Sequence, residues 1–167
     1  EAGATVCAVS RTQAKADSLV AEIEVEGGAG AGFSADVMSL NSVKSLGRSI
    51  QDKFGRVDIL VNSAGGNDPG ATTGGDKKFW DLGEDGLRNV MNLNLLGTMF
   101  PCQIFGEIMA EQREGCIINV SSMAALTPIT RVVGYSATKA GIDNFTRWLA
   151  VHMAKECAPE IRVNAIA

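Results

Sequence analysis

The sequence predicts an α/β protein built on a doubly wound parallel sheet. Four short runs, at residues 5–9, 57–62, 116–120 and 162–166, are almost continuously apolar. Such runs are typical of strands that are covered on both faces, because a strand with one wet face would alternate apolar and polar residues. Segments of helical character separate the runs, and this alternation favours parallel strands between two layers of helices.

The helical segments follow the strands in order. The first begins after Thr12, a residue type that caps helices, and runs to about residue 26. The second is predicted at 41–54, with Gly55 as its stop. Its buried stripe consists of apolar residues three and four apart, namely Val43, Leu46, Ile50 and Phe54.

Two longer helices complete the pattern, at about 84–111 and about 135–156. A short strand is expected at 32–35. A length of 167 residues corresponds to one domain, and we expect a single domain over residues 1–167. The chain opens on what reads as the end of a helix and closes on a strand without a turn. We therefore expect it to cover the middle of a domain.

The composition excludes several classes of function. The net charge of −4 is not gathered into blocks, so a nucleic-acid partner is not expected. No apolar run reaches about 18 residues and no leader is recognisable, so we expect neither membrane association nor export. The four cysteines form no CxxC pair and predict buried, reduced thiols in a cytoplasmic protein without a bound metal.

Polar or small residues follow every predicted strand. Ser10 and Arg11 follow the first, Asp36 and Val37 the short one, "NSAGG" at 62–66 the next, and Ser121 and Ser122 the fourth. The carboxyl ends of parallel strands meet at one edge of a doubly wound sheet, where ligands bind. A nucleotide site is therefore expected at this edge.

Tyr135 and Lys139 are spaced to share one face of a helix. A nearby ammonium lowers the pKa of a phenol, which brings tyrosine closer to the range useful for acid–base catalysis. At the edge of a nucleotide-binding sheet the pair predicts a proton donor and acceptor for an alcohol or ketone. The alternative is a tyrosine that packs its ring beside a lysine extending to solvent.

Ser122 and Asn94 favour the catalytic interpretation. Ser122 follows a strand and precedes Tyr135 by 13 residues, so its hydroxyl is expected to orient a reacting oxygen, although a serine here also suits a turn or helix cap. Asn94 lies inside the long apolar helix, where asparagine is a poor helix former. It is expected either to hold a water near Lys139 or to lie on a solvated face.

Together with "NSAG" at 62–65 and "IRVNAIA" at 161–167, these four side chains resemble the short-chain dehydrogenase/reductase family. The resemblance implies a Rossmann-type fold and hydride transfer between a nicotinamide cofactor and a carbonyl or secondary alcohol. It implies that Tyr135 is the acid/base, that Ser122 orients the substrate oxygen, that Lys139 binds the nicotinamide ribose and lowers the tyrosine pKa, and that Asn94 holds a water. The remaining cofactor contacts that it implies are Asp36, Val37, Asn62, Ala64 and Gly65.

The chain departs from the family pattern at both ends. The glycine-rich phosphate loop, with its strand and helix, and the terminal Pro-Gly segment are absent. Without that strand we expect a slot between the strand carrying Arg11 and the strand carrying Asn62. Ser10 and Arg11 occupy the position that selects the cofactor, and a basic residue there accommodates a 2′-phosphate. NADP(H) is therefore favoured, with NAD(H) as the alternative.

The substrate prediction depends on the long loop at 65–85. This loop and residues 122–135 resemble a branch of the family that reduces sugar acids, of the fructuronate reductase (mannonate oxidoreductase) type. Such a substrate needs a cation and hydrogen-bonding groups, and the candidates are Asn67 and Arg131, with Lys77 and Lys78 nearby. The alternatives are a 3-oxoacyl thioester reductase and a nucleotide-binding protein without activity. The resemblance also implies a homo-oligomer, a dimer or tetramer, assembled through the long helices.

Overall fold

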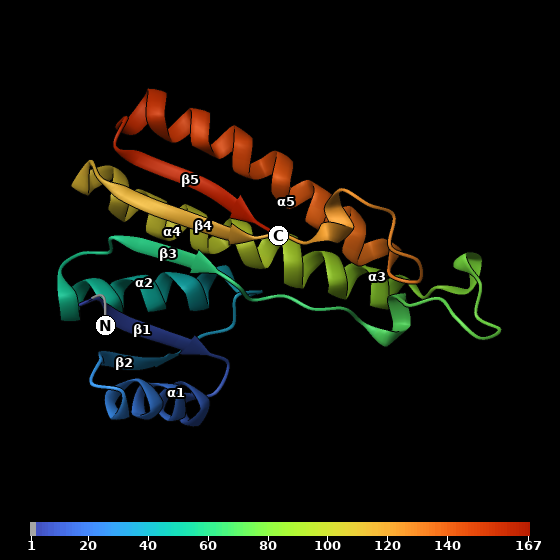
Figure 1. The fold of residues 1–167 in the computed structure, drawn as a ribbon, viewed down its shortest axis with the longest axis horizontal. Coiled ribbons are helices and arrows are strands. Elements are labelled where there is room, and N and C mark those ends of the chain that lie inside the picture. The colour runs from blue at the N-terminus through green and yellow to red at the C-terminus, as the bar shows by residue number, and fades with distance from the viewer. Residues whose placement is uncertain (1–2) are drawn as a thin grey trace.

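The computed structural model describes residues 3–167, and all the predicted strands are present. They are β1 (Thr5–Ser10), β2 (Ala29–Ser34), β3 (Ile59–Asn62), β4 (Gly115–Val120) and β5 (Ile161–Ile166). The helices are α1 (Gln13–Val25), α2 (Leu40–Phe54), α3 (Glu84–Met91), α4 (Gly97–Gln112) and α5 (Val133–His152). Strands and helices alternate as predicted (Figure 1).

The strands are all parallel but form two separate sheets. β1 pairs with β2, starting from Thr5 opposite Ala29. β4 lies between β3 and β5. Among the described residues β1 and β3 are not hydrogen-bonded to each other, so the sheet is divided where the sequence predicted a slot.

Helix α1 covers one face of the β1–β2 pair. A side chain on Gly30 would meet Val20 of α1, and one on Gly32 would meet Ala16 and Asp17. The alternate strand residues point to the opposite face, where Phe33 packs against the core between α2 and α4. The close approach of α1 explains why β2 is rich in glycine, and that composition hid the first half of the strand from the sequence pattern.

Helices α2, α4 and α5 cover the other face of the sheets. In α2 the predicted stripe is confirmed, since Val43, Leu46 and Ile50 are buried against Phe105 and Ile108 of α4. Burial of each such side chain contributes about 1.5–3 kcal/mol to folding. A second core joins α4, β4, β5 and α5, and its central residues are Met109, Ile117, Leu149, Met153 and Ile161.

The opposite face of β3–β5 has no helix over it among the described residues. Ile59 and Val61 of β3 are 59% and 53% exposed, while Leu60 between them is partly buried. The strands are apolar on both faces, but here only one face meets a helix.

Several element ends differ from the sequence expectation. The third strand begins at Ile59, because the Gln112 side chain occupies both main-chain groups of Val57, with bonds of 2.8 Å and 2.8 Å. Thr12 stands at the start of α1 but its hydroxyl makes no capping bond. Gly55 ends α2 as predicted, in a left-handed conformation with φ of 75°.

The predicted helix at 84–111 is interrupted. A π-helical turn, η3 (Asn92–Leu96), separates α3 from α4, and it carries the buried Asn94. Such turns are often found at functional sites. A second π-helical turn, η5 (Met153–Cys157), extends α5. None of the described helices combines the length and apolar character that a membrane span requires.

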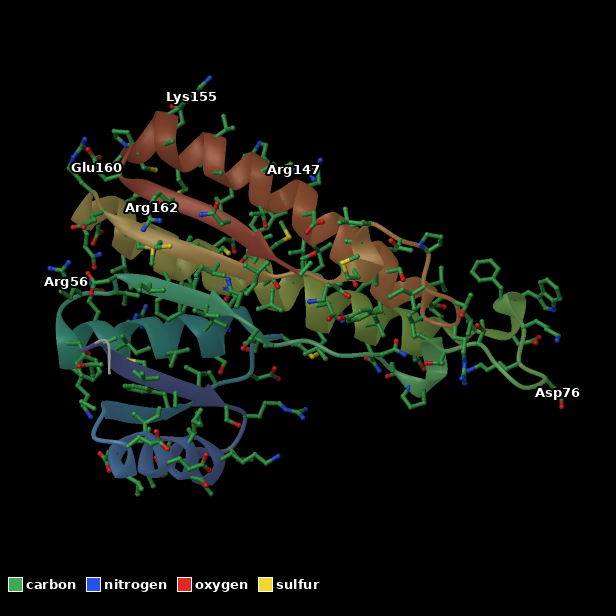
Figure 2. All side chains as sticks on the ribbon, in the orientation of Figure 1. Arg56, Asp76, Arg147, Lys155, Glu160 and Arg162 are labelled. Atoms are coloured by element: carbon green, nitrogen blue, oxygen red, sulfur yellow. The ribbon has the colours of Figure 1, made fainter. Side chains whose placement is uncertain are left out.

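All the strands point their carboxyl ends toward the same side of the molecule (Figure 1). The long loop after β3 projects beyond this edge, with Asp76 at its outer tip (Figure 2). It contains two short 3₁₀ helices, η1 (Pro69–Ala71) and η2 (Phe79–Asp81). The start of α5 and η4 (Met123–Ala125) lie at the same end of the molecule.

Candidate active site

Asn94 fastens the loop that follows β3. Its side-chain Oδ1 accepts from the Gly66 N–H at 3.1 Å, and its Nδ2 donates to the Gly66 carbonyl at 2.7 Å and to the Val90 carbonyl at 2.8 Å. Asn94 is 0% exposed, so the solvated-face alternative is wrong. Its main-chain carbonyl accepts from the Thr98 hydroxyl at 2.8 Å. The side chain therefore positions the exposed residues 63–65 of the loop.

Gly65 marks the point where three elements meet. A Cβ atom at this position would lie 2.7 Å from Asn94 Oδ1 and 3.6 Å from Lys139 Nζ. The first distance is too short for a side chain, so a residue without a side chain is required here. The loop after β3, the π-helical turn and α5 are thus brought together around one small surface.

Lys139 is directed into this meeting point. The residue is 4% exposed, and its Nζ donates to the Val120 carbonyl at the end of β4 over 2.6 Å. The same Nζ lies 5.5 Å from the centre of the Tyr135 ring. Burial lowers the pKa of Lys139, and the negative charge of Asp143 opposes that shift. The alternative of a lysine that extends to solvent is wrong.

Tyr135 and Ser122 belong to two elements, α5 and the end of the β4–η4 segment, that pack against each other. Tyr135 is the third residue of α5 and is half-buried. Ser122 caps η4, which packs against α5, and its hydroxyl accepts from the Ala124 N–H at 3.1 Å. The capping role weighed for Ser122 is therefore present, and the hydroxyl still has a proton to donate.

The residues at the carboxyl ends of β1 and β2 form a second part of the sheet edge at which a nucleotide is expected. The Ser10 carbonyl accepts from Ala35 N–H at 2.9 Å, while Arg11 is exposed. The Asp36 carboxylate accepts from the Met38 N–H at 2.9 Å in a local turn. Val37 packs at the start of α4, because a Cβ on Gly97 would lie 3.0 Å from its Cγ2.

Asn62 faces away from this edge. Its Nδ2 donates to Asn119 Oδ1 at 2.9 Å and to Cys102 Sγ at 3.2 Å inside the protein. Asn119 in turn donates to the Thr146 hydroxyl of α5 at 2.9 Å. The Nδ2 group of Asn62 is thus taken up by contacts inside the protein. The sequence pattern did not identify Asn119, which looks like any other residue of an apolar strand.

An open pocket of about 450 Å³ lies beside the start of α5. It brings together the two predicted substrate residues, Asn67 and Arg131, and its other lining residues are Pro69, Thr72, Thr73 and Gly74. Lys77 is turned into the loop, where its Nζ donates to the Gly70 carbonyl at 2.9 Å. Neither Lys77 nor Lys78 lines the pocket.

Among residues 3–167 the metal-ligating side chains, the cysteines and the histidine form no second candidate site. Over residues 3–167 the structure holds no cluster of three His, Cys, Asp or Glu side chains suited to a metal. All four cysteines are unpaired, and only Cys102 is fully buried, so the expectation of buried thiols is wrong for the other three. His152 stacks on the exposed Trp148 at 5.0 Å, far along α5 from Tyr135.

Residues 1–167 match the short chain dehydrogenase family. An oxidoreductase of uncharacterised activity from Haemophilus influenzae is 41% identical over 91% of this chain and 56% of its own length. The Bacillus subtilis oxidoreductase UxuB, also uncharacterised, is 40% identical over 99% of this chain and 61% of its own length.

The fold also matches solved structures. A crystal structure from Haemophilus influenzae with bound NAD, provisionally described as a D-mannonate oxidoreductase, superposes with a TM-score of 0.91 at 38% identity. The match covers 99% of this chain and 61% of that one. The chain thus spans roughly three fifths of the length of these relatives. The matched sequence and the parallel α/β fold together establish that the chain belongs to the short-chain dehydrogenase family.

Proposed function

We propose that this protein transfers a hydride between a nicotinamide cofactor and the carbonyl or secondary alcohol of a sugar acid. The observation that supports the reaction class best is the meeting of Asn94, Gly65 and Lys139 beside Tyr135, at the carboxyl edge of the strands. A ligand at this edge contacts an exposed loop, a buried cation and a phenol at once. Those are the groups that a carbonyl reduction needs.

Each of these side chains has a role that its geometry suits. Tyr135 donates a proton to the carbonyl oxygen during reduction and removes it during oxidation. The Lys139 ammonium, 5.5 Å from the tyrosine ring, stabilises negative charge that develops there. Ser122 donates its hydroxyl proton to the same substrate oxygen. Asn94 fixes the loop that the cofactor contacts and, through its position beside Lys139, keeps a water within reach.

The edge fits a nicotinamide dinucleotide. Gly65 leaves space where a side chain would clash, and Arg11 offers an exposed cation after β1. When bound, the nicotinamide supplies or accepts the hydride. The residues that would hold the cofactor are Ser10, Arg11, Asp36, Val37, Ala64 and Gly65, the main chain of Asn62, and Lys139 with Tyr135.

NADP(H) is the favoured cofactor, because the Arg11 guanidinium can bind a 2′-phosphate in a bidentate manner. Solved relatives carry NAD in two cases and NADPH in a third, so they leave the preference open. Arg11→Ala should raise the KM for NADPH at least about tenfold and leave the KM for NADH nearly unchanged. Arg48→Ala, at an exposed position on α2, is the control. A wild-type preference for NADH would refute this assignment.

A sugar acid is the favoured substrate. The solved relative described provisionally as a D-mannonate oxidoreductase supports this class, and so does the pocket that joins Asn67 to Arg131. The competing substrate is a 3-oxoacyl thioester, since a 3-oxoacyl-[acyl-carrier-protein] reductase from Synechocystis is 32% identical over 95% of this chain. An open pocket with a cation suits a small polar acid better than an acyl chain.

The test is a spectrophotometric screen of the protein with both nicotinamide cofactors. D-mannonate, other sugar acids and an acetoacetyl thioester are offered in turn. We expect turnover of a sugar acid, and Tyr135→Phe should reduce kcat by about 10²–10⁴-fold while the cofactor still binds. Turnover of only the thioester would favour the competing substrate. Cofactor binding without any turnover would favour the non-catalytic alternative.

We also propose that the protein is a cytoplasmic homo-oligomer. Trp148 and Val151 are 60% and 56% exposed on α5, as expected of a helix that packs against a second copy. The four unpaired cysteines support a reducing compartment. Sedimentation of the wild type and of Trp148→Glu tests the assembly, and a wild type that sediments as a monomer would exclude it.

A further inference from the structure

We propose that Arg131, held in place by Thr73 and Gly74, forms a subsite for the carboxylate of the substrate. This inference rests on the proposed function, because it assigns the acid group of the sugar acid to a particular place. Its evidence is the geometry around Arg131, which comes from the segment before α5 and contacts the long loop after β3.

Arg131 binds both main-chain groups of Thr73, a residue 58 positions earlier. The Thr73 N–H donates to the Arg131 carbonyl at 2.8 Å, and Arg131 Nε donates to the Thr73 carbonyl at 2.9 Å. Arg131 adopts a φ of 83°, a left-handed conformation that costs a residue with a side chain about 1–2 kcal/mol. Such strain persists where surrounding contacts enforce it, and here the two bonds to Thr73 do so.

Gly74 makes room for the guanidinium. A Cβ atom at Gly74 would lie 2.7 Å from both Nε and Nη2 of Arg131 and 2.9 Å from Cζ. The guanidinium group thus lies directly against this glycine. Any side chain at position 74 would push the cation away from its present place, whereas Gly75 has open space around it.

The two Nη atoms of Arg131 make no hydrogen bond and no ion pair within residues 3–167. The pocket beside them is lined by Asn67, Pro69, Thr72, Thr73 and Gly74, and none of these carries a negative charge. A fixed guanidinium with free donors matches a carboxylate in a bidentate manner. Thus the pocket presents one positive charge to an anion that enters it.

The position of the subsite agrees with the proposed reaction. Arg131 and Tyr135 are four positions apart in the chain, so their Cα atoms lie within about 14 Å of each other. One small substrate can therefore reach the guanidinium with its acid group while its hydroxyl or carbonyl lies beside the phenol. Lys77 is excluded as the anion-binding cation, because its ammonium bonds the Pro69 and Gly70 carbonyls.

Steady-state kinetics of the protein with D-mannonate and with its neutral counterpart D-mannitol test the subsite. Arg131→Ala should raise the KM for D-mannonate about 10–100-fold, since a hydrogen-bonded charge is lost, and leave the KM for D-mannitol and for the cofactor unchanged. Arg113→Ala is the matched control, because Arg113 is exposed and has a left-handed φ of 62°. Arg113→Ala should change none of the three KM values.

A second pair of variants tests the role of the glycine. Gly74→Ala should raise the KM for D-mannonate in the same direction as Arg131→Ala. Gly75→Ala, which introduces a side chain at a left-handed glycine with free space, should not. Equal effects of the two glycine variants would show that loop strain, rather than displacement of the guanidinium, is responsible.

Failure of the subsite is distinguishable from failure of the proposed function. If the wild type turns over D-mannonate and Arg131→Ala does so with an unchanged KM, the subsite is refuted while the function stands. If the wild type turns over no sugar acid, calorimetry is used to measure the binding of D-mannonate in the presence of cofactor, and this binding tests the subsite by itself. Binding that is lost in Arg131→Ala supports the subsite, and absent or unaltered binding overturns it.

Discussion

Asn119 offers the most direct test of what holds the site together. It is 0% exposed and joins three elements: Asn62 of β3 donates to its Oδ1, and its Nδ2 donates to Thr146 of α5, each over 2.9 Å. Cys102 of α4 adds a weak contact at 3.6 Å. Asn119→Ala removes this junction between the strand that leads into the Gly65 loop and the helix that carries Tyr135.

The expected loss of folding free energy follows from the polar groups and the space that Asn119→Ala leaves without a partner. The Asn62 amide keeps only the Cys102 sulfur, and a buried polar group without a proper partner costs about 1–3 kcal/mol. The Thr146 hydroxyl still donates to the Ile142 carbonyl, so it adds less. The space left by the missing amide costs about 1 kcal/mol more. We expect a loss of about 3 kcal/mol, which lowers Tm by about 6–12 °C.

Urea unfolding followed by circular dichroism measures this loss. Asn164→Ala is the control, because Asn164 lies on β5 of the same sheet with its side chain exposed, and its effect should stay within about 0.5 kcal/mol. Asn62→Ala and the double variant complete a cycle, in which a coupling of at least about 0.5 kcal/mol is expected. Additive losses, or an Asn119→Ala effect no larger than that of the control, would refute the reasoning.

Three further outcomes are expected. Burial raises the pKa of the Cys102 thiol to about 12, against the opposing effect of its hydrogen bonds with Asn62 and Asn119, so Cys102 stays protonated at pH 8. Mass spectrometry after iodoacetamide treatment of the folded protein should find Cys116 and Cys157 labelled well before Cys102, and equal labelling would contradict this. Gly86→Ala should cost about 1–3 kcal/mol in urea unfolding, because its Cβ would lie 2.5 Å from the Gly70 carbonyl carbon, whereas Gly83→Ala, with open space, should cost less. Burial lowers the pKa of Lys139 below its ordinary 10.5, so activity that needs the ammonium should fall on the alkaline side below that pH. Asp143→Asn removes the charge that opposes the shift, and the alkaline limb of kcat/KM should move to lower pH; a move to higher pH would contradict the assignment.

Local sequence patterns were enough to predict most of the helices and strands. The stripe from Val43 to Ile50 fixes which face of α2 is buried, because a helix repeats its face every 3.6 residues whatever lies opposite. The same periodicity places Tyr135 and Lys139 on one face of α5. The predicted bounds of β3 and β2 were wrong because residues distant in the sequence determine where these strands begin. Gln112 shortened β3 by occupying the main chain of Val57, and the closeness of α1 required the glycines that obscured β2.

The sequence by itself determined the order of strands and helices, the shared edge of their carboxyl ends, and the candidate side chains Asn94, Ser122, Tyr135 and Lys139. Only the tertiary structure decided how they are used. It showed that Asn94 fastens Gly66 and that Arg131 is bound to Thr73, while Lys77 is turned away from the pocket. Periodicity reports contacts within about one turn or one strand. Contacts across 28 or 58 residues depend on how the elements pack, and no local pattern records them.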